Sequence, residues 1–154
     1  MRLALAAMVV AVALALAPAA SSMIVIQRGM AGVAVGMTKS NVLATLGNPM
    51  RIRNSSNEFG TYTRFDYTNL TILFQGGLRV STMRTTAPTE RTAKGIGVGS
   101  TIAAVKAKVP NVKCRRQAGF RDCYVGTFKP GHIITDFQIK NGRVTQVLIG
   151  RVLD

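Results

Sequence analysis

The two cysteines are the residues whose chemistry the sequence defines best. Cys114 and Cys123 are the only cysteines among the 154 residues, and an even count favours a disulfide when the chain is exported. The dipeptide Ala118-Gly119 lies midway between them. A two-residue turn there places the cysteines opposite each other on adjacent strands, with Cα atoms about 4.5 Å apart. A redox or metal role would require closer spacing or more ligands. The sequence therefore predicts a structural disulfide.

Basic residues surround this predicted hairpin. The same register places Arg116 opposite Arg121 on the face of the cysteines, and Arg115 opposite Asp122 on the other face. Two like charges directly opposite each other are unfavourable unless an anion lies between them. Either the arginine pair binds a carboxylate or phosphate, or both side chains extend separately into solvent. The candidate anion-binding or partner-binding residues are Lys113, Arg115, Arg116, Arg121 and Lys129.

No catalytic or cofactor-binding motif is present. His132, the only histidine, would have to act as the base, with Asp136 four residues further along a strand. No serine or cysteine is linked to this pair by a known motif. We therefore predict that the protein is not an enzyme and that it has no catalytic, cofactor-binding or metal-ligating residues.

An internal sequence repeat predicts the elements that position these residues. The segment Gly32–Thr38 (GVAVGMT) recurs 63 residues later as Gly95–Thr101 (GIGVGST). Similarity at a fixed spacing indicates one supersecondary unit used twice. Each copy leads into a short helical pattern, capped by Thr38 in the first copy and by Ser100 or Thr101 in the second.

Strands are predicted downstream of each helix. Residues 61–67, 70–74, 78–83, 133–139 and 143–149 are rich in β-branched and aromatic residues. Asn141-Gly142 is a strong two-residue hairpin signal, which pairs Ile139 with Val144. This pairing leaves Gln146 on an apolar face, so either the strand has a bulge there or the register is shifted by one residue.

Together these signals predict an α+β fold. The expected architecture is a tandem repeat of a short helix packed on an antiparallel meander sheet of three or four strands. The expected segments are a signal peptide at 1–20, a first repeat at 24–86 and a second repeat, with the hairpin disulfide, at 92–154.

The first residues predict export. Arg2 precedes an apolar run at 3–17, which ends in the small residues of an Ala-x-Ala site. The alternative is an uncleaved membrane anchor. No cysteine follows the run to carry a lipid, so we expect a secreted or extracytoplasmic protein, in the periplasm or at the cell surface, without a transmembrane segment in the mature chain.

The chain is strongly basic. Its 20 Lys and Arg residues against 6 Asp and Glu give a formal net charge of +14. Outside a cell this charge attracts acidic protein surfaces, anionic envelope polymers or lipid headgroups, or it only maintains solubility. Nucleic-acid binding is not expected, because export and the few stacking aromatic residues argue against it.

Two family resemblances accompany these patterns. Gly36–Pro49, with Phe65-Asp66-Tyr67 and Leu70–Phe74, resembles the SmpA/OmlA (BamE-like) family, small envelope lipoproteins that support outer-membrane protein assembly. The paired units, the export signal and the hairpin disulfide are similar to the β-lactamase inhibitory proteins, which bind an enzyme with a concave sheet surface. Neither resemblance assigns a functional residue.

The leading functional hypothesis is an exported, non-catalytic protein that binds an acidic protein partner. The alternative is a cationic binder of anionic cell-envelope polymers or lipid headgroups. The two hypotheses differ in salt sensitivity, because polymer binding depends on screened charge whereas an apolar interface does not.

Overall fold

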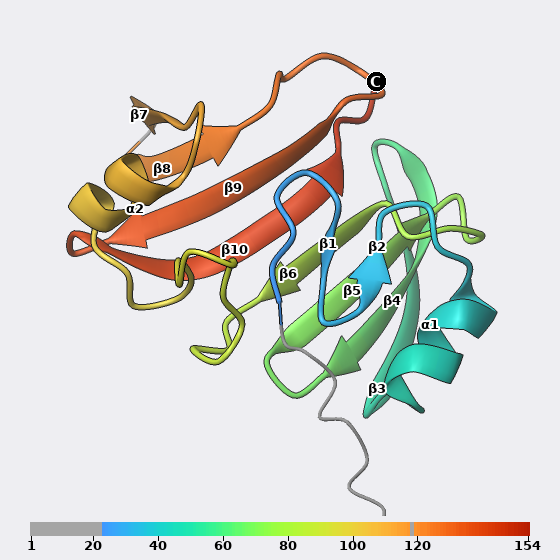
Figure 1. The fold of residues 1–154 in the computed structure, drawn as a ribbon. Coiled ribbons are helices and arrows are strands. Elements are labelled where there is room, and N and C mark those ends of the chain that lie inside the picture. The colour runs from blue at the N-terminus through green and yellow to red at the C-terminus, as the bar shows by residue number, and fades with distance from the viewer. Residues whose placement is uncertain (1–22, 118) are drawn as a thin grey trace, which may run out of the picture.

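The computed structural model describes residues 23–117 and 119–154. The signal peptide predicted at 1–20 lies outside these residues. An eight-stranded antiparallel sheet forms the body of the molecule (Figure 1). Its strands are β3 (Arg51–Asn57), β4 (Gly60–Tyr67), β5 (Leu70–Gln75), β6 (Thr82–Thr85), β7 (Lys113–Gln117), β8 (Phe120–Val125), β9 (Ile133–Lys140) and β10 (Arg143–Arg151), in the order β3-β4-β5-β6-β10-β9-β8-β7. A small sheet pairs β1 (Gly29–Met30) with β2 (Val33–Ala34).

The predicted α+β tandem repeat of a helix on a three- or four-stranded meander is wrong. Strands dominate the described chain, and its two helices contain only eight and seven residues. The decisive contact is the pairing of β6 with β10, in which Met83 lies opposite Ile149. This pairing joins the strands of both predicted segments into one continuous sheet, so the protein is mostly β.

Both helices are short and are stabilised by N-terminal capping and by packing on the sheet. Helix α1 (Lys39–Leu46) begins at Thr38, whose hydroxyl accepts from the backbone N–H of Asn41, and α2 (Ile102–Lys108) begins at Thr101 in the same way. Helices of two turns are marginal by themselves. Each therefore depends on the side chain that it buries, Val42 in α1 and Val105 in α2.

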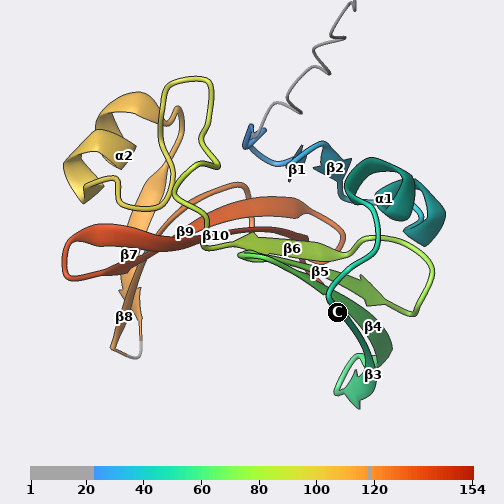
Figure 2. The ribbon, with the colours of Figure 1, turned by 90° about the horizontal axis from the view of Figure 1, so that it is seen from below.

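One face of the sheet carries the core. The burial of β5 alternates, with Leu70, Ile72 and Phe74 buried and the residues between them half-buried, as expected for a strand covered on one side. Phe74 packs edge to face against Phe65, with ring centroids 4.8 Å apart. Both helices and the small sheet lie over this face (Figure 2).

The opposite face of the sheet is concave, and no helix among the described residues covers it. Figure 2 shows the sheet as an arch, whose two end hairpins, β3–β4 and β7–β8, bend away from the helices. Within residues 23–117 and 119–154, no helix is long and apolar enough to cross a membrane.

A β-bulge sets which side chains reach the concave face. The Asn141-Gly142 hairpin pairs Ile139 with Val144 as predicted, and the register then shifts so that Gln146 lies opposite Gln138. The bulge turns Gln146 away from the core. Of the two explanations left open by the sequence, the bulge is the one confirmed.

Candidate functional site

The predicted disulfide is present. Cys114 and Cys123 are directly opposite each other on β7 and β8, with Cα atoms 4.0 Å apart, and they form the disulfide. The same register pairs Arg115 with Asp122 and Arg116 with Arg121, as the sequence analysis expected.

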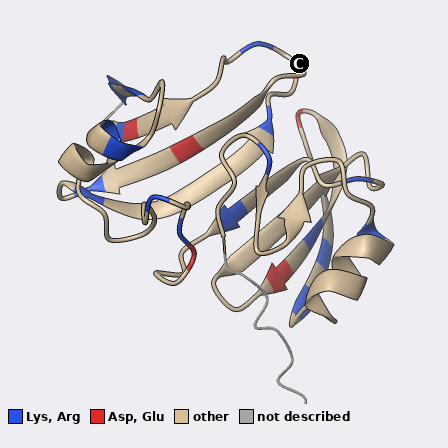
Figure 3. Ribbon diagram, in the orientation of Figure 1, with Lys and Arg blue, Asp and Glu red and all other residues tan. Residues whose placement is uncertain are grey.

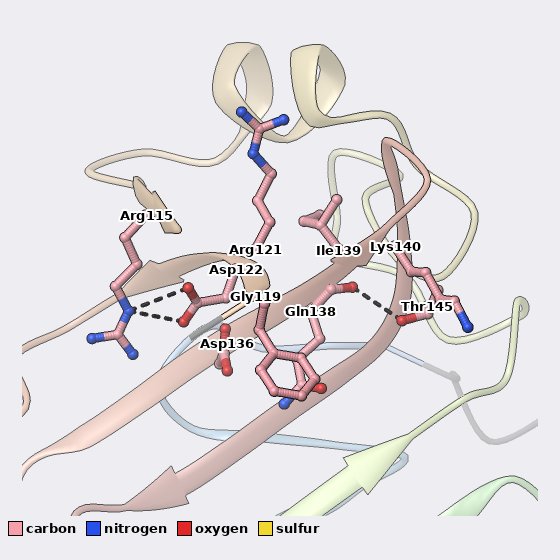
Figure 4. A pocket seen from close by; sticks show the side chains of 10 residues that line it. Arg115, Gly119, Arg121, Asp122, Asp136, Gln138, Ile139, Lys140 and Thr145 are labelled. Carbon is pink, nitrogen blue, oxygen red and sulfur yellow. Dashed lines mark hydrogen bonds and ion pairs between the residues drawn. The ribbon is translucent and has the colours of Figure 1, made fainter. Parts of the chain in front are cut away.

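The five candidate basic residues do not converge on one site. The register places Lys113 and Arg115 on the concave face, and Arg116 and Arg121 on the helix-covered face. Figure 4 shows Arg121 pointing toward a helix, away from Asp122 and Asp136. Lys129 lies in the connection between β8 and β9.

Arg115 is engaged within the protein. Its Nε lies 3.0 Å from Oδ2 of Asp122, and its guanidinium lies 4.9 Å from the ring centre of Tyr124 and 4.2 Å from that of Phe128. Asp122 is buried, at 8% exposure. Arg115 therefore compensates the charge of a buried carboxylate that would otherwise destabilise the folded protein. Arg115 is therefore a structural residue of this hairpin rather than a free anion ligand.

A hollow opens on the concave face where β8, β9 and β10 meet (Figure 4). Its volume is about 720 Å³, within the range of small-molecule sites. The residues that line it are Arg115, Gly119, Phe120, Arg121, Asp122, Asp136, Gln138, Ile139, Lys140 and Thr145.

Asp136 is the most perturbed group in this hollow. Burial raises the pKa of its carboxyl to about 6, with a further increase from the neighbouring charge of Asp122, whereas Arg115 and a hydrogen bond with Gln138 lower it. Its Oδ1 is buried and has no hydrogen-bond partner among the described residues. A carboxylate with an unused buried acceptor is unfavourable unless a ligand supplies a donor.

Gln138 links Asp136 to the next strand. The side-chain amide of Gln146 on β10 donates to Oε1 of Gln138 on β9, and Gln138 is hydrogen-bonded to Asp136. Thr145, at the bulge, donates from its hydroxyl to the backbone oxygen of Gln138. These contacts hold donors and acceptors along one side of the hollow.

His132 does not form a catalytic pair with Asp136. His132 precedes β9 and Asp136 lies within it, four residues apart. At about 3.3 Å per residue a strand separates them by roughly 13 Å, well beyond hydrogen-bonding distance. Within 23–117 and 119–154, no group of three or more His, Cys, Asp or Glu side chains could hold a metal ion.

Exposed aromatic rings lie on the two end hairpins of the sheet. Phe59 is in the turn between β3 and β4, and Phe120 begins β8. They are 43% and 76% exposed. Neither ring was predicted from the sequence as a binding residue, and their position at hairpin turns is the signal that could have identified them.

The comparisons with known proteins identify the fold alone. No family model matches this chain, and no curated protein matches it. An extracellular protein from Bacillus anthracis that contains an SCP domain is similar over 76% of this chain, at 13% identity and a TM-score of 0.56. This chain spans 44% of the length of that protein. The uncharacterized protein yfeY from Escherichia coli is similar over 82% of this chain and 95% of its own length, at 14% identity and a TM-score of 0.52.

The resemblances to the SmpA/OmlA family and to the β-lactamase inhibitory proteins are therefore wrong. Neither family appears among the matched structures, which are the SCP-domain and yfeY-type proteins. The shared Gly36–Pro49 pattern encodes the turn, cap and end of a short helix, features that many unrelated folds use.

Proposed function

We propose that this chain is an exported, non-catalytic binding protein whose concave sheet face docks an acidic protein partner. The observation that carries the proposal is the concave face, which no helix within 23–117 and 119–154 covers (Figure 2). Basic side chains outnumber acidic ones on this face, and exposed aromatic rings lie on the hairpins at its two ends.

The charge of this face supports an acidic partner. The strand registers place on it the basic residues Arg51, Arg53, Arg64, Arg84, Lys113, Arg115 and Lys140 and the acidic residues Asp66, Asp122 and Asp136 (Figure 3). Two of the three acids are already paired, Asp66 with Arg53 and Arg64, and Asp122 with Arg115. The charge left to meet a partner is positive, and complementary charge favours correct docking.

The aromatic ends supply the apolar contacts that a protein interface needs. Aromatic side chains are enriched among the residues that dominate binding energy. Phe120 and Phe59 lie on hairpins that bend toward the concave side (Figure 2). A partner seated in the arch would cover both rings.

Export is part of this proposal. A hairpin disulfide persists in oxidising compartments, and Cys114–Cys123 is such a bond. We assign the protein to the extracytoplasmic space, either in the periplasm or at the cell surface.

The proposal is tested with two charge-reversal variants. Arg84→Glu with Lys113→Glu alters exposed positions on the concave face. Lys94→Glu with Lys106→Glu alters exposed positions in a loop and on α2 and changes the net charge equally. Each oxidised variant is immobilised, exposed to envelope and culture-fluid extract, and washed at low and high salt before mass spectrometry.

The expected result is a discrete acidic protein, retained at high salt by the wild type and by the Lys94/Lys106 variant, and reduced at least about tenfold on the Arg84/Lys113 variant. Equal loss on both variants would overturn the proposal. Retention of anionic polymer alone, lost at high salt, would make net charge the function instead.

A further inference from the structure

The hollow between β8, β9 and β10 has a composition that differs from the rest of the concave face. Most of that face presents unpaired basic groups, whereas the charges around the hollow nearly cancel. Arg115 is paired with Asp122, and Arg121 lines the hollow but its guanidinium is directed toward a helix (Figure 4). One positive group, Lys140, and one negative group, Asp136, remain.

This balance selects against a charged ligand. A small anion would meet the uncompensated carboxylate of Asp136, and a small cation would meet Lys140 and the basic surface around it. A neutral ligand with many hydroxyl groups meets neither penalty, since a hydroxyl both donates and accepts.

The polar groups of the hollow match such a ligand. Nothing in the described part of the chain donates to Oδ1 of Asp136, and the Gln138 amide is held beside this carboxylate by Gln146. The Thr145 hydroxyl and the Lys140 ammonium also line the hollow. Acceptors and donors therefore line the hollow together, on strands rather than on flexible loops.

An apolar platform completes the site. Phe120 lines the hollow and is 76% exposed, although Asp122 and Cys123, further along the same strand, are buried. An exposed ring beside a polar hollow offers a flat apolar surface next to hydrogen-bonding groups.

We propose that this hollow binds one or two units of a neutral saccharide, with a sugar face stacked on Phe120 and a hydroxyl donating to the carboxylate of Asp136. The volume of about 720 Å³ falls within the range of sites for ligands of this size. The inference does not depend on the docking of an acidic protein.

The test is a titration of the oxidised wild-type protein, followed by amide chemical shifts in NMR spectra. The probes are maltotriose, cellotriose and tri-N-acetylchitotriose, with uridine and adenosine as flat neutral ligands of another class. Phe120→Ala and Asp136→Asn are the site variants. Leu78→Ala, an exposed apolar side chain outside the hollow, and Glu58→Gln, an acid in the β3–β4 turn, are their matched controls.

The expected result is saturable binding of at least one trisaccharide, with shifts around Gln138 and Thr145. Each site variant should weaken the affinity about tenfold, and the controls should leave it unchanged. The inference is refuted by three results: no saccharide binds, a nucleoside binds instead, or both site variants bind like the wild type. Phe120 is exposed, so its variant remains folded and keeps the test decisive.

Discussion

Replacing Asp136 with asparagine should stabilise the protein at neutral pH. Burial raises the pKa of this carboxyl from 3.8 to about 6, which means that folding opposes its ionisation. Because the pKa is higher in the folded than in the unfolded chain, the folded state binds more protons between pH 4 and 6. The contribution of Asp136 to the free energy of unfolding therefore falls as pH rises through this window. The destabilisation caused by ionised Asp136 in the folded protein is absent below about pH 4 and complete above about pH 6.

The magnitude follows from the shift. A pKa increase of about 2 units corresponds to roughly 3 kcal/mol between the two protonation states. Asparagine removes the charge but also weakens the hydrogen bond that Gln138 makes with the carboxylate. The weaker hydrogen bond reduces the gain in the free energy of unfolding by about 1 kcal/mol. We expect Asp136→Asn to raise the free energy of unfolding by about 1–2 kcal/mol at pH 7, and to have little effect at pH 4.

The assay is urea unfolding followed by circular dichroism, since the chain contains no tryptophan. It is run at pH 4, 5, 6 and 7 with the disulfide intact, on the wild type, Asp136→Asn and Glu58→Gln. The Glu58 variant removes an exposed carboxylate and should remain within about 0.5 kcal/mol of the wild type. A difference between Asp136→Asn and the wild type that is constant with pH, or that grows toward pH 4, would refute the reasoning.

Two further perturbations test the hairpin beside the hollow. Arg115→Met should destabilise the protein by about 1–3 kcal/mol, because it leaves the buried Asp122 carboxylate without its cation. It should also raise the pKa of Asp136, which Arg115 now lowers; carboxyl chemical shifts in an NMR titration measure this, and an unchanged or lower pKa would contradict the assignment. Cys114→Ser with Cys123→Ser should cost about 2–3 kcal/mol, since the disulfide closes a loop with a sequence separation of 9. Urea midpoints of this variant and of the reduced wild type should agree, and a midpoint equal to that of the oxidised protein would show that the bond adds no stability.

Local signals predicted local structure well. Thr38 caps α1 as expected, and Thr101, one of the two caps expected for the second helix, caps α2. The Asn141-Gly142 turn set the register of β9 and β10, and the misplaced polar side chain of Gln146 signalled the bulge. In each case a few neighbouring residues decide the conformation by turn geometry, capping or side-chain alternation.

Long-range pairing could not be predicted from the same signals. Strand β3 was missed because all seven of its residues are exposed, so no alternation of apolar residues marks it. The pairing of β6 with β10 joins segments more than 60 residues apart. The sequence of neither strand indicates which strand it pairs with. The fold class was therefore wrong although many of its strands were right.

The candidate site was predicted only in part, for the same reason. The predicted hairpin register already placed Arg115 and Arg116 on opposite faces, and the structure confirms it, so the list of candidate basic residues joined side chains that do not share a site. Asp136 was considered only with His132, since its relation to Asp122 and Gln138 depends on the β8–β9 register. Sequence proximity on a strand separates side chains, and pairing across strands brings them together.

The concave face also explains why net charge alone does not define the function. A charge of +14 attracts any polyanion from a distance, but screening limits this attraction to about 10 Å in ordinary salt. At contact, the arrangement of groups decides what binds. On this face the paired acids Asp66 and Asp122 leave a basic surface, whereas Asp136 keeps one hollow close to neutral. One face thus presents two chemically different surfaces, and a variant at Arg84 or at Phe120 should disturb one of them without the other.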